Sequence, residues 1–215
     1  MATIAIFGGT GYAGGHIKEE ALRRGHLVIS ASRKDSGTPD RPDLIQRTGN
    51  IHDPAFVDQL AAEADVLVVA VRAGAQDGVR LVDAIPSLTA SAAAHSTRLG
   101  VVGGAGSLLV TEGGPRVVDM PDFPDAHKGE ALGQADVLTA LGQTPADVDW
   151  FYVSPAAGFG SYNPGEYTGQ YRVGGDVLIG DANGTSFISG ADYGKAFIDE
   201  IEQLAHRRVR FSVAY

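Results

Sequence analysis

The residues with the clearest chemical pattern are the glycines that follow the apolar segment 3–7. Residues 8–15 read Gly-Gly-Thr-Gly-Tyr-Ala-Gly-Gly, which satisfies both G-x-G-x-x-G and G-x-x-G-x-x-G. Such a turn needs glycine because its backbone takes positive φ, approaches a pyrophosphate closely and packs a helix against a strand. Amides at the helix N-terminus then hold the pyrophosphate. We expect a dinucleotide site, the alternative being a tight turn without ligand, formed by Gly8, Gly9, Thr10, Gly11, Tyr12, Ala13 and Gly14.

The residues after the second apolar segment, 27–31, bear on the choice of dinucleotide. Ser32, Arg33 and Lys34 stand there, and the first carboxylate is Asp35. In this type of site an acidic residue binds the ribose 2′-hydroxyl of NAD, whereas arginine accommodates the 2′-phosphate of NADP. The sequence therefore favours NADP(H) over NAD(H). The alternative is that the two cations only begin a solvated loop.

Several other chemistries lack the residues that they need. The chain has no cysteine, which excludes disulfides and CxxC redox or metal motifs. A Gly-x-Ser-x-Gly nucleophile elbow is absent, which disfavours a hydrolase. No metal site is expected, because no spacing typical of metal ligands occurs among the six histidines, which are His16, His26, His52, His95, His127 and His206.

The glycine turn requires a strand before it and a helix after it, and the sequence supplies both. Apolar, β-branched runs recur with helical stretches between them at residues 3–7, 27–31, 66–71, 99–102 and 150–154. Near-continuous apolar strands that alternate with helices are typical of a parallel sheet covered on both faces. The sequence predicts an α/β fold with a Rossmann-type, doubly wound parallel sheet.

Helices are predicted between these strands. The first contains Gly14 and ends before Gly25, where a glycine past the C-cap is common. Asp53 and Pro54 are the expected N-cap and first residue of a helix that runs to about residue 62. Further helices are expected at 76–95, kinked or divided at Pro86, and at 126–141 and 191–205, before a last strand at 209–213.

The segment after Pro155 has a different texture, with many glycines between short aromatic and polar pieces. We expect residues 156–190 to form an irregular, substrate-covering lobe at the C-terminal side of one NAD(P)-binding domain that spans 1–215. Four aromatic side chains of this lobe are candidates to stack on a planar substrate, or else to form its small core: Phe159, Tyr162, Tyr167 and Tyr171.

Charge and hydropathy limit the partners. Seventeen Lys and Arg against 26 Asp and Glu give a formal net charge of −9, which disfavours nucleic acid and anionic membranes. The N-terminus has no basic stretch, its apolar run stops at Gly8, and no run approaches the roughly 20 apolar residues of a membrane span. We therefore expect a cytoplasmic protein, a monomer or a homodimer, whose partner is a small molecule.

Five segments, taken in order, resemble the atypical short-chain dehydrogenase/reductase family. They are residues 8–14 (GGTGYAG), 49–54 (GNIHDP), 101–107 (VVGGAGS), 149–155 (DWFYVSP) and 189–196 (SGADYGKA). The resemblance is to the small NAD(P)H-binding branch that includes NmrA-like proteins, biliverdin reductase B-like flavin reductases and NADH-flavin reductases.

The resemblance implies roles for further residues. Asn50 and Ile51 would border the adenine, although many relatives have aspartate in place of Asn50. Val71 and Arg72 would line the cofactor, and Arg72 could alternatively form a salt bridge at the rim of the sheet. The residues expected near the nicotinamide ring are Gly103, Gly104, Ser107, Pro155 and Ala156.

The sequence departs from the family in its catalytic residues. None of the seven tyrosines is followed four places later by lysine, so the Tyr-x-x-x-Lys pair that protonates carbonyl substrates is missing. The candidates that remain are Ser107, Lys128 and His127, which could hydrogen-bond the nicotinamide or the acceptor or steady developing negative charge. For each, the alternative is a solvated or locally bonded side chain.

These observations predict an NADPH-dependent oxidoreductase that transfers hydride to a planar acceptor such as a flavin or quinone. Such acceptors need little protonation, so holding two rings in contact is sufficient. The main alternative is a non-catalytic NADP-binding redox sensor of the NmrA-like type. An epimerase or dehydratase acting on a nucleotide sugar is disfavoured by the missing tyrosine.

Overall fold

The computed structural model describes residues 1–35, 37, 39–75 and 78–215. Within them, eight strands form one sheet in the order β3-β2-β1-β4-β5-β6-β8-β7. All neighbouring strands are parallel except β7, which is antiparallel to β8. The strands are β1 (Thr3–Phe7), β2 (Leu27–Ser32), β3 (Leu44–Thr48), β4 (Val66–Val69), β5 (Arg98–Val102), β6 (Trp150–Ser154), β7 (Arg172–Gly174) and β8 (Val209–Ala214).

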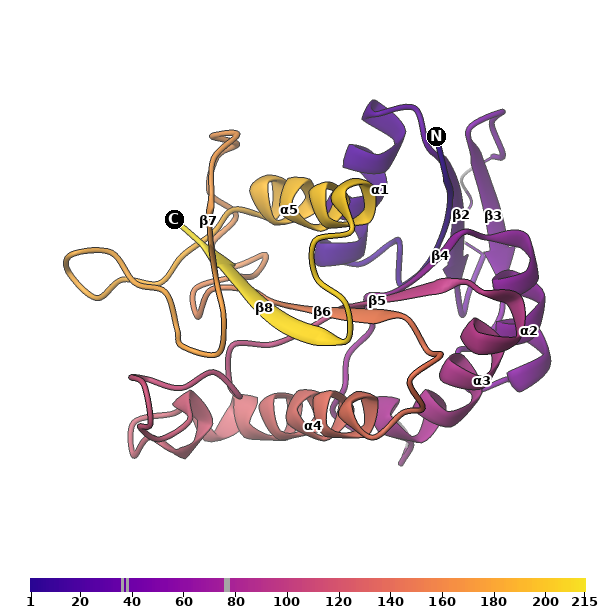
Figure 1. The fold of residues 1–215 in the computed structure, drawn as a ribbon. Coiled ribbons are helices and arrows are strands. Elements are labelled where there is room, and N and C mark those ends of the chain that lie inside the picture. The colour runs from indigo at the N-terminus through magenta and orange to yellow at the C-terminus, as the bar shows by residue number, and fades with distance from the viewer. Residues whose placement is uncertain (36, 38, 76–77) are drawn as a thin grey trace.

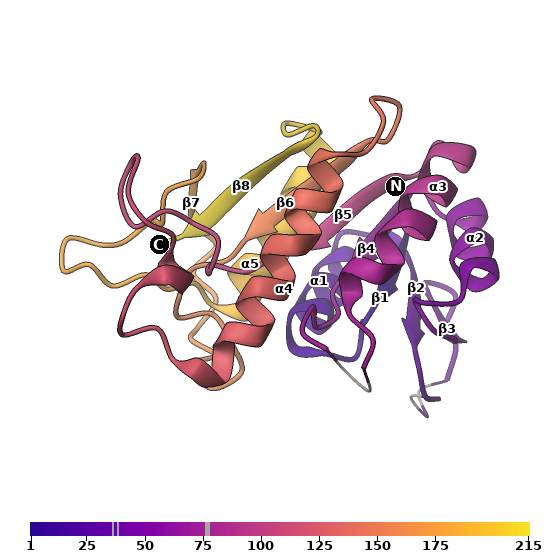
Figure 2. The ribbon, with the colours of Figure 1, turned by 90° about the horizontal axis from the view of Figure 1, so that it is seen from below.

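Helices cover both faces of this sheet. Figure 1 shows α1 and α5 on one face and α2, α3 and α4 on the other, and Figure 2 shows the second face with α4 lying across it. The predicted α/β fold with a Rossmann-type parallel sheet is confirmed. The helices are α1 (Tyr12–Arg23), α2 (Pro54–Glu63), α3 (Ile85–His95), α4 (Asp125–Gly142) and α5 (Gly190–Gln203), with short 3-10 helices at Leu81–Ala84 and Val117–Asp119.

The apolar composition of the strands explains the two-sided core. Strands β1, β4, β5 and β6 are buried along nearly their whole length, as the interior strands of a doubly covered sheet must be. Their side chains divide between two clusters, one facing α2, α3 and α4 and the other facing α1 and α5. Each cluster holds its helices against the sheet.

Local signals set several element ends as predicted. Asp53 caps α2 by accepting hydrogen bonds from the amides of Ala55 and Phe56, and Pro54 begins the helix. Gly25, at a φ of +80°, follows the C-cap of α1. The positive φ explains why glycine stands there.

Several elements differ from the sequence predictions. Strand β3 was not expected, because it is only half buried, and the irregular lobe contains one short strand, β7, of three mostly exposed residues. The predicted helix 76–95 is a 3-10 turn followed by α3, and Pro86 lies in the first turn of α3 rather than kinking it. Gln76 lies outside the described residues, and 78–80 are not helical. Strand β4 ends at Val69, two residues earlier than expected.

The lobe after Pro155 is fastened to α5 by a buried carboxylate. Asp192 accepts hydrogen bonds from the amides of Thr168 and Gly169, both at 2.8 Å, and from the hydroxyls of Ser189 and Tyr215. Burial alone would raise the pKa of Asp192, but these hydrogen bonds outweigh it and lower the pKa below its ordinary value. The ionised carboxylate is therefore what the lobe binds.

None of the helices formed by the described residues is long and apolar enough to cross a membrane.

Candidate functional site

The carboxyl ends of the central strands meet at one edge of the sheet, and two cavities lie there. The strand order reverses between β1 and β4, the position at which open α/β sheets bind ligands. One cavity, about 420 Å³, lies over the glycine turn, and we call it the glycine-turn cavity. The other, about 940 Å³, lies over the first turns of α4, and we call it the α4 cavity.

The glycine-turn cavity is formed by the ends of four strands and the loops that follow them. Predicted cofactor-binding residues make up much of its wall. They are Gly8, Thr10, Gly11, Ser32, Arg33, Asn50, Ile51, Val71 and Arg72.

Two glycines of the turn are required by close backbone contacts. Gly8 has a φ of +87°, and a Cβ added there would lie 2.4 Å from the carbonyl oxygen of Ala70. A Cβ at Gly14 would lie 2.2 Å from the carbonyl oxygen of Gly8. Gly14 therefore lets α1 approach the turn closely. Neither position 8 nor position 14 has room for a side chain.

The N-terminus of α1 is suited to an anion. Gly11 is the N-cap and offers no side chain to the free amides, and the first turn contains no acidic residue. The amides and the positive end of the helix dipole thus face the cavity without a competing carboxylate. The turn fits a pyrophosphate.

Cations rather than carboxylates directly follow β2, where a ribose 2′-substituent was expected. Arg33 lines the cavity after β2, whereas Lys34 does not and is exposed. Ser32 donates a hydrogen bond to the carbonyl of Lys34. Asp35 accepts a hydrogen bond from the amide of Gly37 and does not line the cavity.

The loop after β3, where the adenine was expected, lines one side of the cavity. Ile51 is buried, and the Asn50 side chain accepts a hydrogen bond from the amide of His52. His52 and Gly49 line the cavity beside them. Asn50 thus fixes its own loop.

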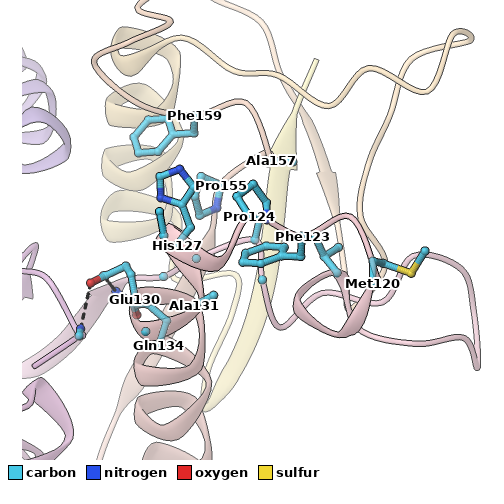
Figure 3. Close-up of a pocket in the computed structure, with 18 of the residues that line it drawn as sticks. Met120, Phe123, Pro124, His127, Glu130, Ala131, Gln134, Pro155, Ala157 and Phe159 are labelled. Atoms are coloured by element: carbon cyan, nitrogen blue, oxygen red, sulfur yellow. Dashed lines mark hydrogen bonds between the residues drawn. The ribbon is translucent and has the colours of Figure 1, made fainter.

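The α4 cavity is larger and mainly apolar. It includes the expected ring-side residues Gly103, Gly104, Pro155 and Ala156. Its outer wall comes from loops that precede α4 and from the C-terminal lobe, and Figure 3 shows part of it. The apolar residues of this outer wall are Val110, Val117, Met120, Phe123, Pro124, Phe159 and Leu178.

Of the three predicted catalytic side chains, only His127 lines this cavity. Figure 3 shows its imidazole directed toward Pro155 and Phe159. Lys128, the next residue, instead pairs with Asp125 at 2.6 Å. Adjacent residues on a helix point about 100° apart, so the two side chains cannot share one face.

Ser107 is placed away from the cavity. It is buried, does not line the cavity, and its Oγ accepts a hydrogen bond from Arg210 Nη1 at 2.9 Å. Arg210 also binds Asp176. The geometry gives Ser107 the locally bonded role that was its alternative.

Glu130 is a site residue that the sequence did not suggest. Its two carboxylate oxygens accept hydrogen bonds from the amides of Ala73 and Gly74, both at 2.9 Å, and thereby join α4 to the loop after β4. The partners are backbone amides more than 50 residues away, which leave no trace in local sequence.

Tyr152 supports the opposite side of the same cavity from the core. Its hydroxyl accepts a hydrogen bond from the amide of Gly104 and donates to Gln134. Burial raises the pKa of Tyr152, while the Gly104 hydrogen bond acts in the opposite direction. This tyrosine is buried and is a fixed structural donor.

The four aromatic candidates of the lobe separate into two groups. Phe159 and Tyr162 line the α4 cavity. Phe159 also packs on Tyr193 of α5, with 4.5 Å between ring centroids, so it contributes both to the cavity and to the core that faces α1 and α5. Tyr171 hydrogen-bonds Asp199, and neither it nor Tyr167 lines the cavity.

Arg72 is the residue that both cavities share. It is exposed, and it forms no ion pair or hydrogen bond with any other residue that the structure describes. The salt bridge considered as its alternative is therefore not seen in this part of the chain. The Arg72 guanidinium can therefore be reached from both cavities.

No group of three or more His, Cys, Asp or Glu side chains in residues 1–35, 37, 39–75 and 78–215 is placed to hold a metal ion.

Three solved structures resemble this chain closely. The Burkholderia pseudomallei protein named "Putative exported protein" is 37% identical, with 100% of both chains covered and a TM-score of 0.85. A "putative epimerase" from Bacteroides thetaiotaomicron is 29% identical over 99% of this chain and 96% of its own, with a TM-score of 0.88. A "putative NADH-flavin reductase" from Streptococcus pneumoniae TIGR4 is 30% identical over 100% and 99%, with a TM-score of 0.79.

A family model described as NAD(P)H-binding matches residues 8–203. The match begins at the glycine turn and ends with α5, and it confirms the resemblance inferred from the sequence. Because it covers most of the chain, this protein belongs to the NAD(P)H-binding family.

Proposed function

We propose that this protein is an NADPH-dependent reductase that transfers hydride to a planar acceptor of the flavin or quinone type. The family and the likeness to a protein named as a reductase support an oxidoreductase-type role. The single observation that carries the finer proposal is the pair of cavities that meet at Arg72. The glycine-turn cavity would hold the adenosine and pyrophosphate, and the mainly apolar α4 cavity would take the nicotinamide ring and the acceptor beside it.

The residues present fit NADPH. The turn at Gly8 and the uncapped amides of α1 would hold the pyrophosphate, and Arg33 would meet the 2′-phosphate. Asn50 and Ile51 would border the adenine, and Val71 would contact the sugar side of the cofactor. Gly103, Gly104, Pro155 and Ala156 would surround the ring that, when bound, supplies the hydride.

The chain contributes placement and exclusion of water rather than a strong acid. Phe159 and Pro155 close one side of the α4 cavity, and Met120 and Phe123 lie farther along it (Figure 3). His127 lines this cavity, and we propose that it hydrogen-bonds an acceptor oxygen. Lys128 and Ser107 already bind Asp125 and Arg210, so we propose that neither contacts the acceptor.

The test is NADPH consumption by purified protein with a panel of flavins and quinones. NADH is run in parallel, and cofactor binding is titrated separately. Saturable turnover with one acceptor class supports the reductase. Tight NADPH binding with no turnover over the panel contradicts it and supports the redox sensor instead.

Location and assembly belong to the same proposal. We propose a cytoplasmic monomer or homodimer, because NADPH is supplied inside the cell. Cell fractionation and light scattering test this. Recovery in an extracytoplasmic fraction, which the name of the Burkholderia relative makes worth checking, would contradict the location.

A further inference from the structure

We infer that the acceptor is an uncharged, mainly apolar quinone and that the α4 cavity selects against acceptors that carry a phosphate. This inference rests on the proposed reductase function and narrows its substrate class. It is drawn from the distribution of charge and polarity over the cavity wall.

Among the described residues that line this cavity, only four have acidic or basic side chains. They are Arg72, Asp122, His127 and Glu130. Arg72 lies at the junction with the glycine-turn cavity, where the pyrophosphate of the proposed cofactor would attract it. The Glu130 carboxylate is held by the amides of Ala73 and Gly74.

The acceptor side is thus left with one imidazole and one exposed carboxylate, Asp122. A phosphate placed there would meet no lysine or arginine. Flavin phosphates are dianions near neutral pH, and a dianion beside a carboxylate with no cation is disfavoured.

The N-terminus of α4 does not replace the missing cation. Its first turn already contains Asp125, which pairs with Lys128. A carboxylate in the first turn occupies the favourable end of the helix dipole. The one nearby ammonium group is likewise engaged.

The apolar wall also distinguishes a quinone from a sugar-bearing flavin. Met120, Phe123 and Leu178 offer contact surface but no hydrogen bonds to the hydroxyls of a ribityl chain. Burying hydroxyls against such a wall costs free energy unless they are bonded. A bare ring system with carbonyl oxygens matches the wall, and His127 can donate to one oxygen.

The reaction balances with the proposed cofactor. The quinone takes up a hydride at one carbonyl oxygen, breaking a C–H bond of the reduced cofactor and forming an O–H bond. The second oxygen takes a proton from water or from His127. The products are the hydroquinone and NADP⁺, and no further oxidant is needed.

The experiment measures acceptor binding to protein saturated with NADP⁺, so that no turnover occurs. Isothermal titration compares 1,4-naphthoquinone with its 2-sulfonate, and lumiflavin with riboflavin and FMN. We expect the sulfonate to bind at least about tenfold more weakly than the parent quinone. Affinity should fall from lumiflavin to riboflavin to FMN.

A charge-reversal variant sharpens the test. Asp122→Lys places a cation on the wall, and we expect it to narrow the gap between the quinone and its sulfonate. Glu112→Lys makes the same change in net charge at an exposed residue that does not line the cavity, and it should leave the gap unchanged. Circular dichroism confirms that both variants are folded.

The outcomes separate this inference from the proposed function. Equal or tighter binding of FMN and the sulfonate overturns the inference while leaving the reductase intact. NADP⁺ binding with none of the five compounds bound overturns the inference and counts against the reductase as well. Failure to bind NADP⁺ overturns both.

Discussion

The glycine-turn cavity and the α4 cavity share Arg72 but are constructed differently. The first is enclosed by short segments that directly follow β1, β2, β3 and β4. The second is enclosed by loops around residues 103–124, the start of α4, and pieces of the lobe after Pro155. Backbone geometry dominates the one, and side chains from distant segments dominate the other.

This difference shows how strictly the sequence limits the residue types at each cavity. A pyrophosphate is recognised by amides and by the absence of side chains, so few residue types can satisfy it. An apolar wall can be made by many residue types. We therefore expect changes at the glycine turn to abolish binding and changes around α4 to adjust it.

The largest effect is expected from Gly8→Ala. The added Cβ would lie 2.4 Å from the Ala70 carbonyl oxygen at a φ of +87°, so the turn must shift. We expect NADPH affinity to fall more than about 100-fold, together with a lower melting temperature. The control is Gly113→Ala, which has a φ of +68° but no atom within 4 Å of the added Cβ. Equal NADPH affinity in both variants would contradict the backbone argument.

The next largest effect is expected on the preference for NADPH over NADH. Arg33→Asp should weaken NADPH binding roughly 10- to 100-fold, the value of a charge-assisted hydrogen bond, while NADH binding changes little. Lys34→Asp is the matched control, because this neighbouring cation does not line the cavity. Both cofactors are titrated against each variant. Equal losses for NADPH and NADH would remove the assignment of the 2′-phosphate to Arg33.

A smaller effect is expected where α4 is joined to the loop after β4. Glu130→Gln leaves one of the two amides, Ala73 or Gly74, without a carboxylate partner. We expect the free energy of unfolding to fall by about 1–3 kcal/mol and acceptor KM to rise severalfold.

NADPH affinity of Glu130→Gln should stay within about twofold of the wild type, because Glu130 does not line the glycine-turn cavity. This result would show that the two cavities can be changed independently. Asp136→Asn, which removes an exposed contact to Arg80 farther along α4, is the control and should change stability by less than about 1 kcal/mol. Parallel losses of NADPH and acceptor binding in Glu130→Gln would show that the cavities act as one unit.

The smallest effect concerns acid stability of the lobe. The pKa of Asp192 is lowered in the folded chain, so its contribution is present above the unfolded pKa, about 3.9, and is lost as the pH falls through the folded value. Urea unfolding of the wild type should show falling stability below about pH 4. Asp192→Asn should be less stable at pH 6 and less sensitive to acid, whereas Glu166→Gln, an exposed carboxylate of the same lobe, serves as control. An unchanged acid slope in Asp192→Asn would contradict the assignment.

The sequence was most informative where local pattern and burial coincide. The apolar runs at residues 3–7 and 150–154 are strands with those bounds, and Asp53-Pro54 begins α2. Strand β3 has no such run, because it is half buried and includes Gln46 and Arg47. Edge strands of this kind carry a weak periodic signal.

In the candidate site, too, the residues with a local sequence pattern were predicted and those that depend on distant contacts were not. Most of the glycine-turn wall was predicted: the turn and residues 32–33 follow recognisable strands, and the family resemblance implied Asn50, Ile51, Val71 and Arg72. The role of Glu130 was missed, and the sequence could not choose between His127 and Lys128 without the rotation of α4. Likewise, Ser107 is engaged by Arg210, which lies 103 residues away on β8.

Because β8 is the last strand in the sequence, the part of the sheet around the glycine turn and the part around the α4 cavity can be completed at different times during synthesis. Strands β1 to β4 come from the first 69 residues and pair with one another, so the glycine turn can form while the ribosome is still making the rest. The other half waits for residues 209–214, which pair between β6 and β7 and hold Ser107 through Arg210. A nascent chain stalled before residue 209 would therefore present a dinucleotide-binding turn without a finished acceptor wall.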